Sequence, residues 1–195
     1  MTTLPATPPD GPSRDAMARS GPDSYAEYKP VRLTVNGQVQ QRLVAPRTHL
    51  VDFLRNDLGL TGSHLGCEHG VCGACTVRLD GVIVRGCLVL AVQADGRRVD
   101  TVEGLTDDGT LHDLQAAFLA RNAFQCGFCT SGMLLTASEL VATRPSANRD
   151  EIREFISGNY CRCTGYQAIV DAIEDVLATR RERATGAVQD TGSLA

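Results

Sequence analysis

The chain has 195 residues, a formal net charge of −4 and a pI near 5.5, a length that suits one domain or two small ones. Hydrophobic residues make up 43% and charged residues 22%, an ordinary composition that can bury a core. The acidic balance and the lack of Trp argue against a nucleic-acid partner, because no basic stripe exists to release counterions from a polyanion. No apolar run of about 18 residues is present, so no membrane span is expected.

The first 29 residues are rich in Pro, Ser, Asp and Ala, and they contain neither an apolar region nor a twin-arginine pair of an export signal. Residues 1–29 are therefore predicted to be a polar extension of a cytoplasmic protein. A reducing cytosol disfavours structural disulfides, so cysteines there more often bind metal or do redox work. The chain has eight cysteines, and they fall into two groups of four.

Residues 30–104 carry the signals of a small α+β domain. Alternating apolar residues predict five strands, at residues 31–35, 39–44, 76–79, 82–84 and 99–102. Asn36-Gly37 and Asp80-Gly81 supply the tight turns of two hairpins. Thr48 is predicted to cap a short helix that ends at Gly59.

Residues 105–181 change to a helical apolar period and predict four amphipathic helices, followed by a polar tail at 182–195. Thr110 is the predicted cap of the first helix, and Asn148 with Glu151 has capping-box spacing for the third. The four stripes are predicted to form core: Leu111, Leu114 and Phe118; Met133, Ala137, Leu140 and Val141; Ile152, Phe155 and Ile156; and Tyr166, Ile169, Val170, Ile173, Val176 and Leu177.

The first cysteine group comprises Cys67, Cys72, Cys75 and Cys87. Its first three members have the C-x4-C-x2-C spacing that is typical of a plant-type [2Fe–2S] cluster. Gly66, Gly70 and Gly73 lie between or beside them, can take positive φ at little cost, and would bring backbone N–H groups toward an anionic cluster. The gap to the fourth cysteine is shorter than in plant-type ferredoxins, but the predicted hairpin returns the chain to the loop.

Three other interpretations compete for this group. A structural zinc site also uses four cysteines, although interleaved glycines at this spacing are unusual for zinc. A Rieske centre would pair Cys67-x-His69 with a second Cys-x-x-His, and the sequence has Cys72-x-x-Cys75 there. His69 is therefore predicted to be a loop residue with a satisfied polar contact. A disulfide framework does not suit the predicted compartment.

The second cysteine group comprises Cys126, Cys129, Cys161 and Cys163. The first pair precedes the helix predicted to begin near Thr130, and the second pair precedes the helix predicted to begin near Tyr166. Unpaired N–H groups and the positive end of the helix dipole would then face an anionic cluster. C-x2-C combined with C-x-C is also compatible with zinc; the helix-end placement and the first group favour a second [2Fe–2S] cluster.

Three ordered motifs carry a family resemblance: GCEHGVCGACTV at 66–77, QCGFCTSGM at 125–133 and NYCRCTGY at 159–166. The sequence resembles the small iron–sulfur subunit of molybdenum hydroxylases, the family of xanthine dehydrogenase, aldehyde oxidoreductase and carbon monoxide dehydrogenase. One mild departure is Ser131, where many members have Pro; Ser also suits a first helical turn, so no loss of function is expected.

The resemblance implies an N-terminal ferredoxin-like β-grasp domain followed by a C-terminal four-helix bundle domain. It implies a large partner subunit with molybdopterin in a dinucleotide form and a medium partner subunit with FAD, in a heterotrimer or its dimer. Gln125 and Cys163 would be the residues next to the pterin. Single electrons would pass from the molybdenum site through the two clusters to FAD or another acceptor. The chain itself shows no catalytic constellation, and the alternative is a standalone two-cluster ferredoxin.

Overall fold

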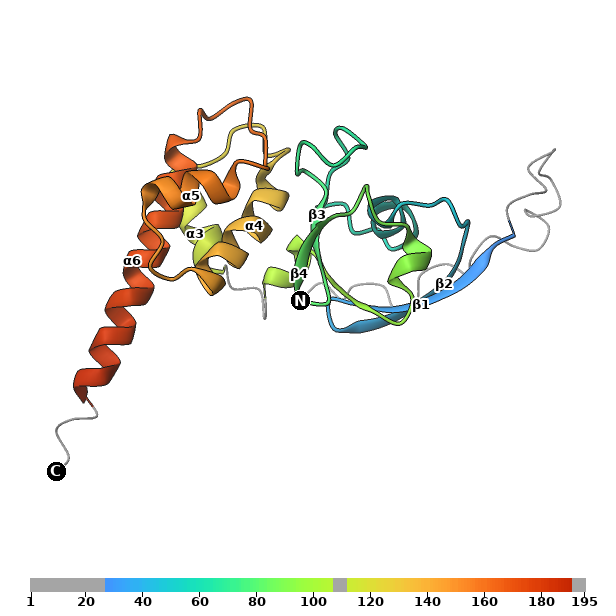
Figure 1. Ribbon diagram of the computed structural model, residues 1–195, viewed down its shortest axis with the longest axis horizontal. Coiled ribbons are helices and arrows are strands. Elements are labelled where there is room, and N and C mark those ends of the chain that lie inside the picture. The colour runs from blue at the N-terminus through green and yellow to red at the C-terminus, as the bar shows by residue number, and fades with distance from the viewer. Residues whose placement is uncertain (1–26, 107–111, 191–195) are drawn as a thin grey trace, which may run out of the picture.

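A computed structural model describes residues 27–106 and 112–190 of the chain. A five-stranded sheet lies on one side of the molecule and four longer helices lie on the other (Figure 1). The α+β class expected from the sequence is therefore confirmed. No helix in the two described ranges is long and apolar enough to cross a membrane.

The sheet is mixed, in the order β2-β1-β5-β3-β4. Strands β1 and β5 run parallel, and the other neighbours run antiparallel. The bounds are Lys29–Val35 for β1, Gln38–Val44 for β2, Thr76–Leu79 for β3, Val82–Arg85 for β4 and Arg98–Asp100 for β5. Asn36 and Gly37 have φ of 48° and 79°, and Asp80 and Gly81 have 50° and 86°, so both predicted hairpin turns are present.

A short helical segment covers the sheet core. Helix α2 (Leu50–Asp52) continues as a π-helical turn over Phe53–Asp57, and Phe53 and Leu54 are fully buried against the strands. The predicted cap at Thr48 is wrong, because His49 is the N-cap and no side chain caps the helix. The Thr48 carbonyl instead accepts a hydrogen bond from the N–H of Ala91, at 2.8 Å.

The four other helices are α3 (Asp113–Ala120), α4 (Thr130–Thr143), α5 (Arg149–Ile156) and α6 (Gln167–Asp190). The predicted cap Thr110 and its neighbour Leu111 lie outside the described residues, and His112 is the N-cap of α3. The predicted capping box of α5 is confirmed, since Asn148 Oδ1 accepts from Asp150 and Glu151 N–H while Asn148 N–H donates to Glu151 at 2.7 Å.

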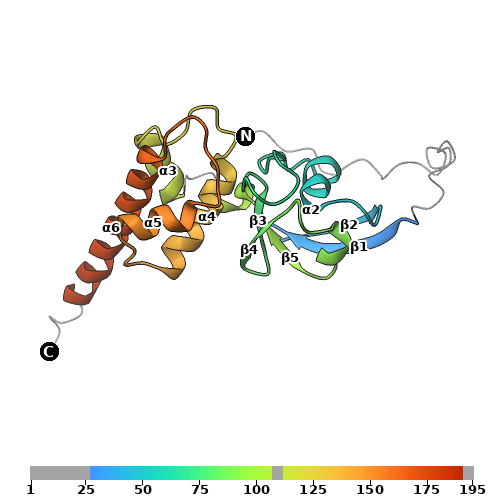
Figure 2. The same ribbon diagram turned by 45° about the horizontal axis from the view of Figure 1, so that its top comes forward.

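The helical core contains nearly all of the predicted stripe residues. Phe155 and Tyr166 are partly buried at its margin. Helix α6 continues to Asp190, so the segment predicted as a polar tail from 182 is helical over much of its length. In Figure 2 the C-terminal part of α6 projects beyond the other helices.

Helix α4 is buried on more than its apolar face, because it packs against β3 and β4 of the sheet as well as against α5 and α6 (Figures 1 and 2). Ser131, Gly132 and Thr136 are buried along with the apolar stripe. A Cβ added at Gly132 would overlap the carbonyl oxygen of Gly73. The two halves of the molecule therefore meet backbone to backbone at Gly132 and Gly73.

We predict that Gly132→Ala destabilises the protein although it lies inside a helix. Alanine in a helix interior is normally favoured over glycine by about 1 kcal/mol. Here the added methyl group must push Gly73 away from α4, and overpacking of this kind costs about 1–3 kcal/mol. Thermal unfolding of the full chain measures the effect. Thr143→Ala, at an exposed position near the end of the same helix, is the control and should leave the midpoint unchanged or slightly raised; an equal fall in both variants would contradict the close contact.

Candidate metal centres

The first cysteine group is assembled by the loop that precedes β3 and by the hairpin that follows it. Cys75 and Cys87 are 1% and 2% exposed, while Cys67 and Cys72 are half-buried. The N–H of Gly86 donates to the carbonyl of Cys75 at 3.0 Å, so the β3–β4 hairpin returns Cys87 to the loop as expected. Val51 and Leu65 pack against the buried pair.

Backbone N–H groups converge on the sulfur of Cys67. The amide of Cys72 lies 3.4 Å from this sulfur, and together with the amides of His69 and Val71 it lowers the pKa of Cys67 to about 6. Gly70 and Gly73 have positive φ as predicted, but Gly66 does not, and Glu68 takes this conformation instead at 59°. His69 is a loop residue with a polar contact, since its Nδ1 donates to the carbonyl of Cys67.

The second cysteine group joins the start of α4 to the loop before α6. Cys129 is the N-cap of α4 and is 8% exposed, whereas Cys126 and Cys163 are exposed and their sulfurs lie 3.5 Å apart. Burial and the neighbouring Cys161 raise the pKa of Cys129 to about 12. Burial alone would raise the pKa of Cys161, but hydrogen bonds from Thr164 and from nearby amides outweigh it and lower that pKa.

Within each group the sulfurs are arranged as an inner and an outer pair. In the inner pairs, buried Cys75 contacts buried Cys87, and buried Cys129 contacts half-buried Cys161. In the outer pairs, half-buried Cys67 contacts Cys72, and exposed Cys126 contacts exposed Cys163. Among the described residues, no three His, Cys, Asp or Glu side chains gather closely enough to hold a single ion. A [2Fe–2S] cluster takes two thiolates on each of its two irons, so two separate pairs suit it.

Four buried polar atoms close in sequence to Cys67 or Cys129 have no hydrogen-bond partner: Ser63 Oγ, His64 Nδ1, Thr130 Oγ1 and Ser131 Oγ. The first two precede Cys67 by a few residues, and the other two follow Cys129 directly in the first turn of α4. Buried donors without partners are rare in folded proteins. Each site supplies four cysteine sulfurs, which is the ligand set that a [2Fe–2S] cluster takes.

The loops that carry the two cysteine groups are in contact with each other, which the sequence did not indicate. The N–H of Tyr160 donates to the carbonyl of Cys72 at 2.8 Å. Phe128, between Cys126 and Cys129, stacks on His64 with ring centroids 4.7 Å apart. A Cβ at Gly66 would lie 3.2 Å from the Phe128 ring, so Gly66 serves close packing rather than positive φ.

Gln125 lies at the surface next to Cys163. Its Nε2 donates to the carbonyl of Cys163 at 3.1 Å, which joins the chain before α4 to the loop before α6. Gln125, Cys126 and Cys163 are all exposed. This edge of the second site is therefore open to a bound group or a partner.

Comparison with known proteins finds two iron–sulfur domain families in the chain. The family described as "2Fe-2S iron-sulfur cluster binding domain" matches residues 33–105, which contain the first cysteine group. The family described as "[2Fe-2S] binding domain" matches residues 101–174, which contain the second. Caffeine dehydrogenase subunit gamma of Pseudomonas sp. (strain CBB1) is 54% identical over 76% of this chain and 91% of that protein.

The small subunit of nicotine 6-hydroxylase from Paenarthrobacter nicotinovorans is also 54% identical, over 74% of this chain and 87% of that subunit. This chain belongs to the small iron–sulfur subunits of molybdenum hydroxylases. Among solved structures, quinoline 2-oxidoreductase from Pseudomonas putida 86 aligns with a TM-score of 0.77 and 49% identity, over 82% of this chain and 98% of that chain. The aldehyde oxidoreductase from Desulfovibrio desulfuricans ATCC 27774 aligns at 0.75 and 41%, over 79% of this chain and 17% of that chain.

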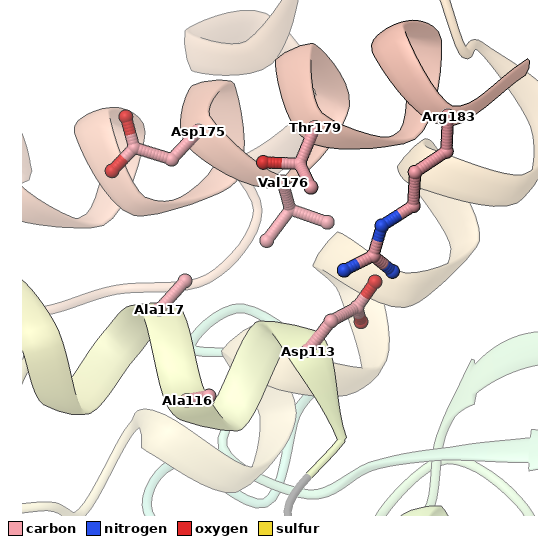
Figure 3. Close-up of a pocket in the computed structure, with 7 residues that line it drawn as sticks. All are labelled: Asp113, Ala116, Ala117, Asp175, Val176, Thr179 and Arg183. Atoms are coloured by element: carbon pink, nitrogen blue, oxygen red, sulfur yellow. The ribbon is translucent and has the colours of Figure 1, made fainter. Parts of the chain in front are cut away.

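A separate groove of about 450 Å³ lies between α3 and α6 of this iron–sulfur subunit (Figure 3). Its floor is apolar and includes Ala117 and Val176, and Asp113 and Arg183 face each other at one end. Asp113 forms an ion pair with Arg180 at 2.7 Å. Burial alone would raise the pKa of Asp113, but Arg180 and His112 outweigh it and hold that pKa below its ordinary value. These charges connect α3 to α6.

We predict that Asp113→Asn destabilises the protein at neutral pH and has little effect in acid. A carboxyl whose pKa is lower in the folded state stabilises it above the unfolded-state pKa of about 3.9, and this contribution is lost as pH falls through the folded-state value. The pair is partly exposed, so the loss is at most about 1 kcal/mol. Urea unfolding at neutral pH and at a pH below the folded-state value measures the difference. Asp150→Asn, at a side chain that is 93% exposed, is the control; a loss that persists in acid would disprove the ionic contribution.

Proposed function

We propose that this chain is the electron-transfer subunit of a molybdenum hydroxylase-type oxidoreductase, with one [2Fe–2S] cluster in each half of the molecule. The observation that supports this proposal best is the division of eight cysteines into two sites of four, each made of two pairs of cysteines, on loops that contact each other. The related subunits named above come from dehydrogenase and hydroxylase enzymes.

The proposed ligands of the first cluster are Cys67, Cys72, Cys75 and Cys87, and those of the second are Cys126, Cys129, Cys161 and Cys163. When bound, each cluster accepts and releases one electron. The inner pairs, Cys75 with Cys87 and Cys129 with Cys161, would hold one iron of each cluster away from water. The outer pairs would hold the other iron near the surface, where a neighbouring redox group can approach.

The partners that fit this role are a large subunit with molybdopterin, in a dinucleotide form, and a medium subunit with FAD, in a heterotrimer or its dimer. Gln125 and Cys163 form the exposed edge of the second site, which makes this edge the proposed contact with the pterin. The sheet half would be a ferredoxin-like β-grasp domain and the helical half a four-helix bundle. Cysteines that act as ligands suit a reducing compartment, so the cytoplasm is the proposed location.

The surface around the cysteine loops favours a permanent partner over the alternative of a standalone carrier. Four large apolar side chains in or beside these loops are between 44% and 61% exposed: Val71, Leu88, Phe128 and Tyr160. Leu88 directly follows Cys87, and Phe128 and Tyr160 lie in or next to the second site. A freely diffusing carrier usually docks through charged groups, whereas apolar and aromatic side chains are enriched at the centres of stable interfaces.

Metal and sulfide analysis tests the proposed function. The complex should contain about four irons and about four acid-labile sulfides per copy of this chain, as two [2Fe–2S] clusters require. Zinc in place of iron, in a colourless protein, would reject the proposal in favour of a zinc-stabilised interaction module. Co-purification with two larger subunits would distinguish a complex from a standalone ferredoxin.

Single-cysteine variants test whether the two sites are separate. We predict that Cys129→Ser removes one of two reduced-cluster EPR signals and leaves the other, because the serine hydroxyl would be a poor ligand for one iron of the second cluster only. Cys75→Ser is the reciprocal variant, at a buried position of the first site, and should remove the other signal. Loss of both signals in either variant would show that the sites do not assemble independently.

A further inference from the structure

The side chain of Asn159 lies between the two cysteine loops and is 1% exposed. Its Nδ2 donates to the carbonyl of Gly73 in the first loop, at 3.1 Å. Its Oδ1 accepts from Thr136 Oγ1 of α4 at 3.0 Å. Asn159 therefore connects the first cysteine loop, helix α4 and the chain that leads into Cys161.

The chemistry of the neighbours determines the orientation of the Asn159 amide. The Gly73 carbonyl can only accept a hydrogen bond, so the amide NH₂ must face it. The Arg85 guanidinium can only donate, and its Nη2 lies 3.5 Å from Asn159 Oδ1 and 2.8 Å from the carbonyl of Gly158. Arg85 precedes Cys87 by two residues. The segment that carries Cys87 therefore also contacts Gly158 and Asn159.

The next residue makes the direct connection between the sites. The N–H of Tyr160 donates to the carbonyl of Cys72 at 2.8 Å. Cys72 belongs to the first cysteine group, and Tyr160 is covalently joined to Cys161 of the second. One backbone hydrogen bond thus links the two groups, and the anchored Asn159 side chain lies immediately before it.

We propose that Asn159 is a positioning residue that sets the coupling between the two redox centres. Its three side-chain contacts hold the Gly73 carbonyl and the Asn159 backbone together, which keeps the Tyr160 amide within hydrogen-bond distance of Cys72. Electron transfer between the sites then depends on an amide that is not a ligand of either. This inference rests on the proposed function, because it requires both clusters to be present.

The test compares Asn159→Ala with Asn148→Ala in the purified complex. Asn148 also uses its side-chain oxygen and lies in the same half of the chain, but it caps α5 rather than joining the sites. Both variants should lower the unfolding temperature and should keep iron content and two reduced-cluster EPR signals. Only Asn159→Ala should weaken the magnetic interaction between the reduced clusters at low temperature and slow electron transfer between them several-fold, measured after a rapid pulse of reductant.

The inference would be overturned if a fully loaded Asn159→Ala complex kept both the magnetic interaction between the reduced clusters and the rate of electron transfer between them. It would also be overturned if Asn148→Ala weakened the interaction and slowed the transfer to the same degree. If Asn159→Ala loses iron, Thr136→Val decides, since it removes the hydroxyl that orients the amide and leaves the donor to Gly73 in place. Thr136→Val should weaken the coupling to a smaller degree, and no change would again overturn the inference. Failure of the proposed function itself is seen separately, as a lack of iron and sulfide in the unmodified complex.

Discussion

The close contact between the first cysteine loop and helix α4 is the constraint on which the rest of the structure depends. Gly73 and Gly132 meet with no room for a side chain at Gly132, and the buried amide of Asn159 bonds to the same carbonyl. This contact brings the sheet half and the helical half together at their cysteine loops rather than at their outer surfaces. The loops of two cysteine sites in separate halves of the chain therefore lie against each other, an arrangement that suits a chain that conducts electrons.

The two sides of this interface are held by different forces. On one side, Phe128 stacks on His64 and covers Gly66, an apolar contact between the loops that carry the cysteines. On the other side, the contacts are polar and partly or fully buried: Arg78 bonds to Ser138 at 2.7 Å, Arg85 bonds to Gly158, and the buried Asn159 amide bonds to Gly73. Buried polar contacts are directional, so they fix relative position more closely than apolar packing alone.

Local signals in the sequence were sufficient where the physics is local. The two hairpin turns, the capping box at Asn148 and the apolar stripes all depend on residues within a few positions of one another. The structure has both turns, the capping box and nearly all of the stripe residues in the helical core. Two local predictions, the helix cap at Thr48 and the positive φ of Gly66, are wrong because residues distant in the sequence contact these positions. The Thr48 carbonyl pairs with Ala91, and helix α2 begins at Leu50 behind His49. The loop spacing predicts positive φ at Gly66, but its φ is not positive. The glycine is needed there because the ring of Phe128 packs closely against it.

The burial of helix α4 was also only partly predictable from its local sequence. Its periodicity predicted one buried face correctly, yet Ser131, Gly132 and Thr136 on the rest of its surface are buried too, because α4 packs against the sheet. Nothing in the local pattern distinguishes a polar residue that faces water from one that bonds across an interface. Asn159 was part of a recognised motif, and its role as a bridge could be read only from its three partners.

By itself, the sequence determined the α+β class, the division of eight cysteines into two groups, and the family, because spacing and order along the chain carry this information directly. Tertiary structure alone decided which sulfurs pair, which of them are buried and how the two groups meet. Those relations depend on contacts between residues dozens of positions apart, such as Tyr160 with Cys72, and pairing over that distance is set by how whole elements pack.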